Sequence, residues 1–174
     1  MIRKGYTHVA EFHYLHNDKN GKPYSNLAEM GERLIAAAMT AGINITLIPV
    51  LYKTGNFGEG PQPRQRRFIS QTIDNYLLLL NATAGVVSKN HNSRLGFGIH
   101  SLRAVDLADI VTTFREGPRT IPFHLHAAEQ LKEVEDCMAY CKRRPIEWLL
   151  ESLPLSDRFH LVHCTHMNDF EVSA

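Results

Sequence analysis

The residues of this chain that could do chemistry stand where apolar segments end. His126 ends the apolar run TIPFHLH, and Glu129 follows three residues later. A neutral imidazole is a good zinc ligand, and a carboxylate just beyond it can move the proton of an activated water. This pair therefore suits metal-assisted hydrolysis, although H-x-x-E alone also occurs as a hydrogen bond at a helix entry. His163 ends the later run FHLVH, either as a further ligand or as a group that polarises a substrate.

A histidine stands at the same relative place on most of the apolar runs, and this recurrence favours an active site over isolated core histidines. His13 and His100 occupy this place on two earlier runs. Arg103, three residues after His100, suits a bidentate grip on a carboxylate or, equally well, a surface ion pair. His16 and His91 are expected to be solvated loop residues.

The elements that must position these residues alternate along the chain. Apolar runs predict strands at 5–16, 43–52, 94–102, 120–126 and 159–166. Apolar periodicity predicts helices at 26–42, 68–83, 105–117 and 130–153. Asn26 with Glu29 resembles a capping box, Gly42 is a natural stop, and Pro145 is expected to break the last helix. The alternation predicts an α/β fold with a parallel sheet, either open and doubly wound or part of a barrel.

Composition and chain ends narrow the class of protein. The chain has 174 residues, a net charge of +1 and three cysteines, so neither nucleic acid nor a membrane is an expected partner and a reducing cytoplasm is the expected location. Residues 1–5 resemble the last turn of a helix, and Asn168 with Glu171 resembles the capping box of another. We therefore expect a fragment of a larger α/β protein.

Several segments together resemble one enzyme family over nearly the whole chain. EFHYLH, HSLRAV and HAAEQLKEVEDC are its most specific motifs, and they resemble the formiminoglutamate deiminases of the amidohydrolase superfamily. The resemblance implies a partial (β/α)8 barrel with about five parallel strands and intervening helices. It also implies one divalent metal, normally zinc. The implied reaction belongs to histidine degradation and hydrolyses N-formimino-L-glutamate, an acidic amidine, to N-formyl-L-glutamate and ammonia.

The resemblance assigns a role to each matching position. His126 matches the metal ligand of the fifth barrel strand, Glu129 matches the acid/base glutamate, and His163 matches the catalytic histidine beside the metal. Three further residues match positions that contact the substrate: Tyr14, His100 and Arg103. His124 is then an inward-facing neighbour without a ligand role.

The family pattern is incomplete in this sequence. An H-x-H motif at the end of the first strand and an aspartate at the end of the eighth are missing, so we expect residues 1–174 to lack the first strand and the last two. One of four protein ligands is then present, and the chain alone is expected to be inactive. The parent protein is expected to be a homodimer. The alternatives are another amidohydrolase deaminase, such as a guanine-like one, and a non-catalytic truncated remnant.

Overall fold

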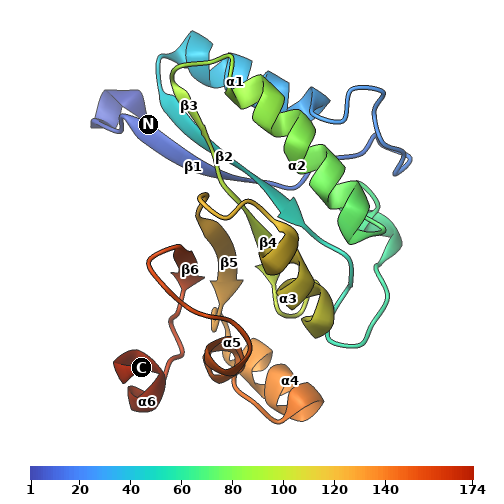
Figure 1. The fold of residues 1–174 in the computed structure, drawn as a ribbon, viewed down its shortest axis with the longest axis vertical. Helices are drawn as coiled ribbons and strands as arrows, with labels where there is room; N and C mark the ends of the chain where they lie inside the picture. The colour runs from blue at the N-terminus through green and yellow to red at the C-terminus, as the bar shows by residue number, and fades with distance from the viewer.

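The computed structural model describes residues 1–174 and contains a curved parallel sheet with helices packed along it (Figure 1). The strands are β1 (His8–His13), β2 (Asn44–Leu51), β3 (Ser93–Leu95), β4 (Phe97–Ser101), β5 (Phe123–Ala127) and β6 (Phe159–His163). The helices are α1 (Glu29–Ala41), α2 (Ile73–Val87), α3 (Leu107–Glu116), α4 (Leu131–Cys141), α5 (Pro145–Ser152) and α6 (Asp169–Ser173). Short 3-10 turns occupy Ile2–Lys4 and Pro63–Gln65.

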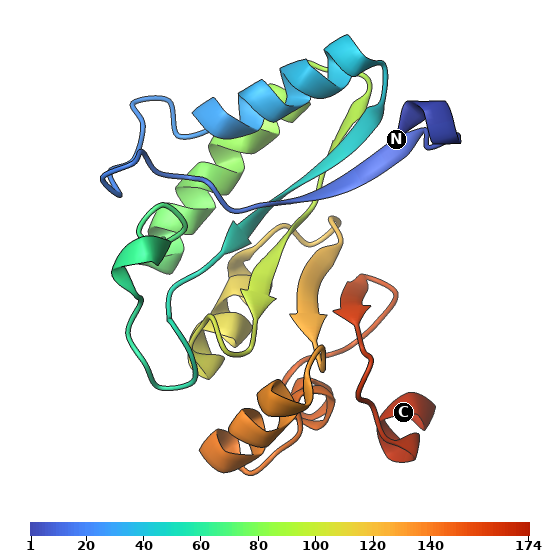
Figure 2. The same cartoon turned by 180° about the vertical axis from the view of Figure 1, so that it is seen from behind.

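The strands follow the order β1-β2-β4-β5-β6, with β3 pairing β2, and every pairing is parallel. Because the strands run in parallel, their carboxyl ends gather at one edge of the sheet, where Figure 2 shows the arrowheads of β4 and β5. The sheet also curls strongly. Phe12 of β1 lies 4.5 Å from His126 of β5, ring centroid to centroid, although β2 and β4 separate the two strands.

The main apolar core lies between the later strands and the helices that cover them. The side chains of Phe97, Ile99, Phe123 and Leu125 are fully buried there. Tyr76 of α2 crosses this layer, and its hydroxyl accepts a hydrogen bond from the Gly98 amide at 3.0 Å. The Tyr76 side chain of α2 thus fixes β4, the strand that contains His100.

Most of the predicted elements are confirmed, with three corrections. The first helix begins at Glu29, and Asn26 forms no capping box, because its side-chain oxygen accepts from the Ala28 amide in the turn before the helix. The helix predicted at 68–83 begins at Ile73 instead, where the Thr72 side chain accepts from the Asn75 amide. The strand predicted at 94–102 is two strands, which are interrupted at residue 96.

The chain ends and the late helices agree with the sequence pattern. Pro145 begins a separate helix, α5, as expected of a proline at a helix start. Asn168 caps α6, and its side chain and that of Glu171 form the reciprocal capping box. None of the helices is long and apolar enough to cross a bilayer.

Candidate active site

Three histidines from successive strands form a connected row at the carboxyl edge of the sheet. The ring of His126 lies 5.1 Å from that of His100 and 5.5 Å from that of His163, centroid to centroid. The aromatic rings of Tyr14 and Tyr52 lie 5.6 Å and 4.8 Å from the His100 ring. The structure therefore brings together the three histidines and Tyr14 that the sequence singled out.

One ring nitrogen of His126 is free to bind an electron-pair acceptor. His126 Nδ1 lies 2.8 Å from the His100 carbonyl oxygen, and a carbonyl can only accept, so Nδ1 carries the proton and donates. In the neutral ring, Nε2 then keeps its lone pair. Burial lowers the pKa of His126, which favours this neutral form. Metal-binding histidines are commonly oriented by such a bond from the other ring nitrogen.

Glu129 lies between a cation and an imidazole. Its Oε2 is 3.4 Å from Arg103 Nη2, and its Oε1 is 3.7 Å from His163 Nε2. All three side chains are partly exposed, with 29% of the Glu129 side chain accessible. The Nε of Arg103 is buried and has no hydrogen-bond partner. Arg103 thus contacts Glu129 while 30% of its own side chain stays accessible.

Two strained turns present these residues. Ala128, directly after β5, has a φ of 49°, while His163 and Cys164, at the end of β6, have φ values of 77° and 52°. Non-glycine residues rarely adopt this left-handed region, and such strain tends to gather at functional sites. In the sheet register Ala127, not His126, is the partner of His163. The left-handed turn at His163 explains how its ring comes close to that of His126.

The environment perturbs the protonation of the residues beside the row. Burial, followed by the nearby His126 and Arg103, lowers the pKa of His100 to about 3. Burial and the neighbouring Tyr52 and Glu129 raise the pKa of Tyr14 to about 12. Near neutral pH, His100 is therefore a neutral ring and Tyr14 a neutral hydroxyl, and both can form hydrogen bonds without adding charge.

Other histidines stay outside the row. His13 turns toward the helix layer near Gly31 and packs its ring 4.9 Å from that of His16. The prediction that His16 is a solvated loop residue is wrong, because only 6% of it is exposed and its Nε2 lies 3.0 Å from the Val50 carbonyl oxygen. His91 is exposed, as expected. His124 is buried and stacks on His160, with ring centroids 4.7 Å apart.

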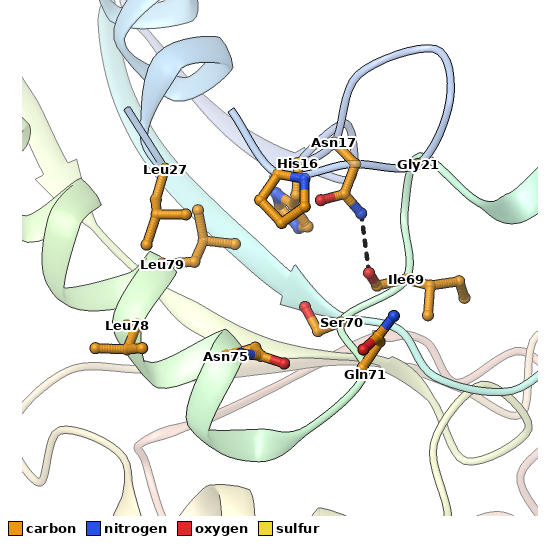
Figure 3. A pocket seen from close by; sticks show the side chains of 11 residues that line it. His16, Asn17, Gly21, Leu27, Ile69, Ser70, Gln71, Asn75, Leu78 and Leu79 are labelled. Atoms are coloured by element: carbon orange, nitrogen blue, oxygen red, sulfur yellow. Dashed lines mark hydrogen bonds between the residues drawn. The ribbon is translucent and has the colours of Figure 1, made fainter. Parts of the chain in front are cut away.

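A cavity of about 260 Å³ lies away from the histidine row, between the loop after β1 and the start of α2 (Figure 3). His16 lines it beside Leu27, Leu79 and other residues, and Asn17 Nδ2 donates to the Ile69 carbonyl oxygen at 2.9 Å along one wall. A polar hollow of about 210 Å³ instead adjoins the site, because Arg103, Gln130 and Glu133 line it.

The histidine row supplies fewer donors than a complete metal site needs. No three of the histidine, cysteine, aspartate and glutamate side chains are arranged to hold an ion. His126, with its free Nε2, and the neighbouring His163 fit as part of a zinc site, which normally takes three or four protein ligands. These two side chains alone are fewer ligands than such a site takes.

Two known proteins are similar to this chain along nearly all of its length. No family model matches it. The chain is 45% identical over its whole length to formimidoylglutamate deiminase of Pseudomonas aeruginosa, of which it spans 38%. An amidohydrolase of Brucella melitensis has a TM-score of 0.89 and 42% identity, with 98% of this chain and 38% of that one covered.

More distant structures share the fold alone. A zinc-bound adenosine deaminase of Xanthomonas campestris has a TM-score of 0.72 at 19% identity, covering 99% of this chain and 34% of that one. A guanine deaminase of C. acetobutylicum has a TM-score of 0.68 at 16% identity, covering 99% and 38%. The predicted fold class is confirmed. This chain has the fold of part of an amidohydrolase barrel, and it is similar from end to end to a segment of formimidoylglutamate deiminase.

Proposed function

We propose that this chain contributes the acid/base group, the substrate contacts and part of the metal site of a zinc-dependent formimidoylglutamate deiminase. The observation that carries the proposal is the position of Glu129, which lies between Arg103 and His163, while the His163 ring lies 5.5 Å from that of His126. The 45% identity to a deiminase along the whole chain supports the same substrate. The reaction converts N-formimino-L-glutamate and water to N-formyl-L-glutamate and ammonia, as a step of histidine degradation in the cytoplasm.

Each residue has a definite task in this reaction. A bound divalent metal lowers the pKa of a water molecule and so supplies a nucleophile near neutral pH. Glu129 accepts the proton of the attacking water and delivers it to the formimino nitrogen, which leaves as ammonia when its bond to carbon breaks. His163, within 3.7 Å of Glu129, polarises the reacting carbon–nitrogen group. His126 is the residue of this chain that would hold the metal, through its free Nε2.

The substrate contacts follow from charge. Formimidoylglutamate carries carboxylates, and the partly exposed Arg103 guanidinium offers a positive charge next to Glu129. A planar guanidinium binds a carboxylate through two parallel hydrogen bonds. Tyr14 and His100, both neutral, complete the recognition of the small acidic amidine.

Residues 1–174 correspond in this proposal to strands two to six of the barrel. One imidazole ligand alone holds zinc weakly, so the chain by itself is expected to be inactive, and the complete enzyme is expected to be a homodimer. This picture needs further ligands from other residues, as the 38% coverage of the relatives allows.

The test is turnover by a complete deiminase barrel that contains this segment. We expect release of ammonia and formylglutamate from formimidoylglutamate and none from guanine. Arg103→Ala should raise KM by about 10- to 100-fold, because a charge-assisted pair is lost. The exposed Arg64 provides the control, since Arg64→Ala removes the same charge outside the site. Turnover of guanine, or an unchanged KM in Arg103→Ala, would refute the acidic substrate.

A further inference from the structure

We propose that Glu133 is a positioning residue that fixes the turn carrying Glu129. This inference rests on the proposed function, because the position of Glu129 matters for its acid/base role. Glu133 lies in the first turn of α4 and is only 4% exposed. Its carboxylate bridges two consecutive backbone amides: Oε1 accepts from Ala128 N at 3.2 Å, and Oε2 accepts from Glu129 N at 3.0 Å.

The turn needs such a clamp because its backbone is strained. Ala128 has a φ of 49°, a conformation that an L side chain disfavours and that glycine would adopt at little cost. The residue before the helix, Gln130, makes no side-chain cap. In an ordinary capping box, the glutamate at the third helical position bonds the amide of the capping residue. Glu133 occupies that third position, but it reaches further back, to the two amides before Gln130.

The clamped turn also touches the other half of the site. The Ala127 carbonyl oxygen accepts from Cys164 N at 3.0 Å, and the Ala128 carbonyl oxygen accepts from His166 N at 3.0 Å. The segment after β6 is therefore hydrogen-bonded to Ala127 and Ala128, which lead into the turn that Glu133 holds. Through Ala128, one buried carboxylate fixes both the Glu129 side and the His163 side of the site.

Hydrogen exchange of single amides tests this in the 174-residue chain, without metal or turnover. In the wild type, the amides of Ala128 and Glu129 should exchange slowly. In Glu133→Ala, both should exchange at least about tenfold faster relative to the Leu125 amide of β5, since hydrogen bonds to a charged acceptor are lost. Glu133→Gln keeps only one acceptor oxygen and should release at least one of the two amides. The exposed Glu135, changed to Gln, is the control with the same charge change on the same helix.

Equal acceleration of the Leu125, Ala128 and Glu129 amides would mean that Glu133 only stabilises the fold, and it would overturn the proposal. Unchanged exchange of Ala128 and Glu129 in both Glu133 variants would overturn it as well. Because Glu133→Gln preserves side-chain shape, its result stands even where Glu133→Ala does not fold.

Turnover separates this inference from the proposed function. In a complete barrel, Glu133→Gln should lower kcat for formimidoylglutamate with KM little changed, because Arg103 is untouched. A raised KM with unchanged kcat would contradict a positioning role toward Glu129. If exchange responds as expected while the wild-type barrel does not turn over formimidoylglutamate, the proposed function fails, whereas the positioning of the turn by Glu133 is still supported.

Discussion

The molecule contains two groups of imidazoles, one buried and one partly exposed, that differ in what surrounds them. His13 and His16 pack against each other, and the Nε2 of His16 is hydrogen-bonded to the backbone of β2. His100, His126 and His163 lie in a row with a carboxylate and a guanidinium beside them. Burial lowers the pKa of His13 and His16 in one group and of His100 and His126 in the other. A lowered pKa therefore does not distinguish the candidate site, whereas the carboxylate and guanidinium of Glu129 and Arg103 near the histidine row do.

The largest expected effect follows from removing the carboxylate next to the histidine row. In a complete barrel, Glu129→Gln should lower kcat by about 10²- to 10⁴-fold, because the amide cannot accept and return a proton. Steady-state kinetics with formimidoylglutamate measures this, with Glu135→Gln as the matched control. Activity of Glu129→Gln within a few-fold of wild type would move the acid/base role to another group.

How far the sequence predicts this site depends on the residue. Alternation along β5 correctly puts His124 and His126 on one face, and the proline after α4 correctly divides two helices. Alternation along β6 would turn the His163 side chain away from the site that it shares with His126. The left-handed turn that brings the side chain back contains no glycine, so the sequence gives no signal of this turn. His16 sits in a polar stretch, LHND, that looks solvated, but the tertiary bond to Val50 buries it. Glu133, four residues after Glu129, was missed because its partners are backbone amides, which no side-chain motif displays.

A smaller effect concerns the other group of imidazoles. Burial lowers the pKa of His16 to about 3 in the folded protein, below its ordinary value of 6.5, so the unfolded chain binds the proton more readily between these values. The free energy of unfolding should therefore fall as the pH drops from about 6.5 toward 3, by about 1.4 kcal/mol per pH unit for each such group. His13, with a pKa lowered to about 4, adds to the slope down to that pH.

Urea unfolding at several pH values measures this loss. His16→Gln should make the free energy of unfolding depend less steeply on pH. The control His91→Gln, at an exposed position, should leave the slope as in the wild type. If His16→Gln left this slope unchanged, His16 would not be a buried, neutral residue in the folded chain.

The most direct test of the difference between the two groups is a zinc titration of the 174-residue chain, followed by NMR of the imidazole nitrogens. Added Zn²⁺ should shift the Nε2 signal of His126 and perturb His163, while His13 and His16 keep their signals. Shifts at His13 and His16 with none at His126 would contradict the claim that the strand-end row is the metal-binding part of this protein.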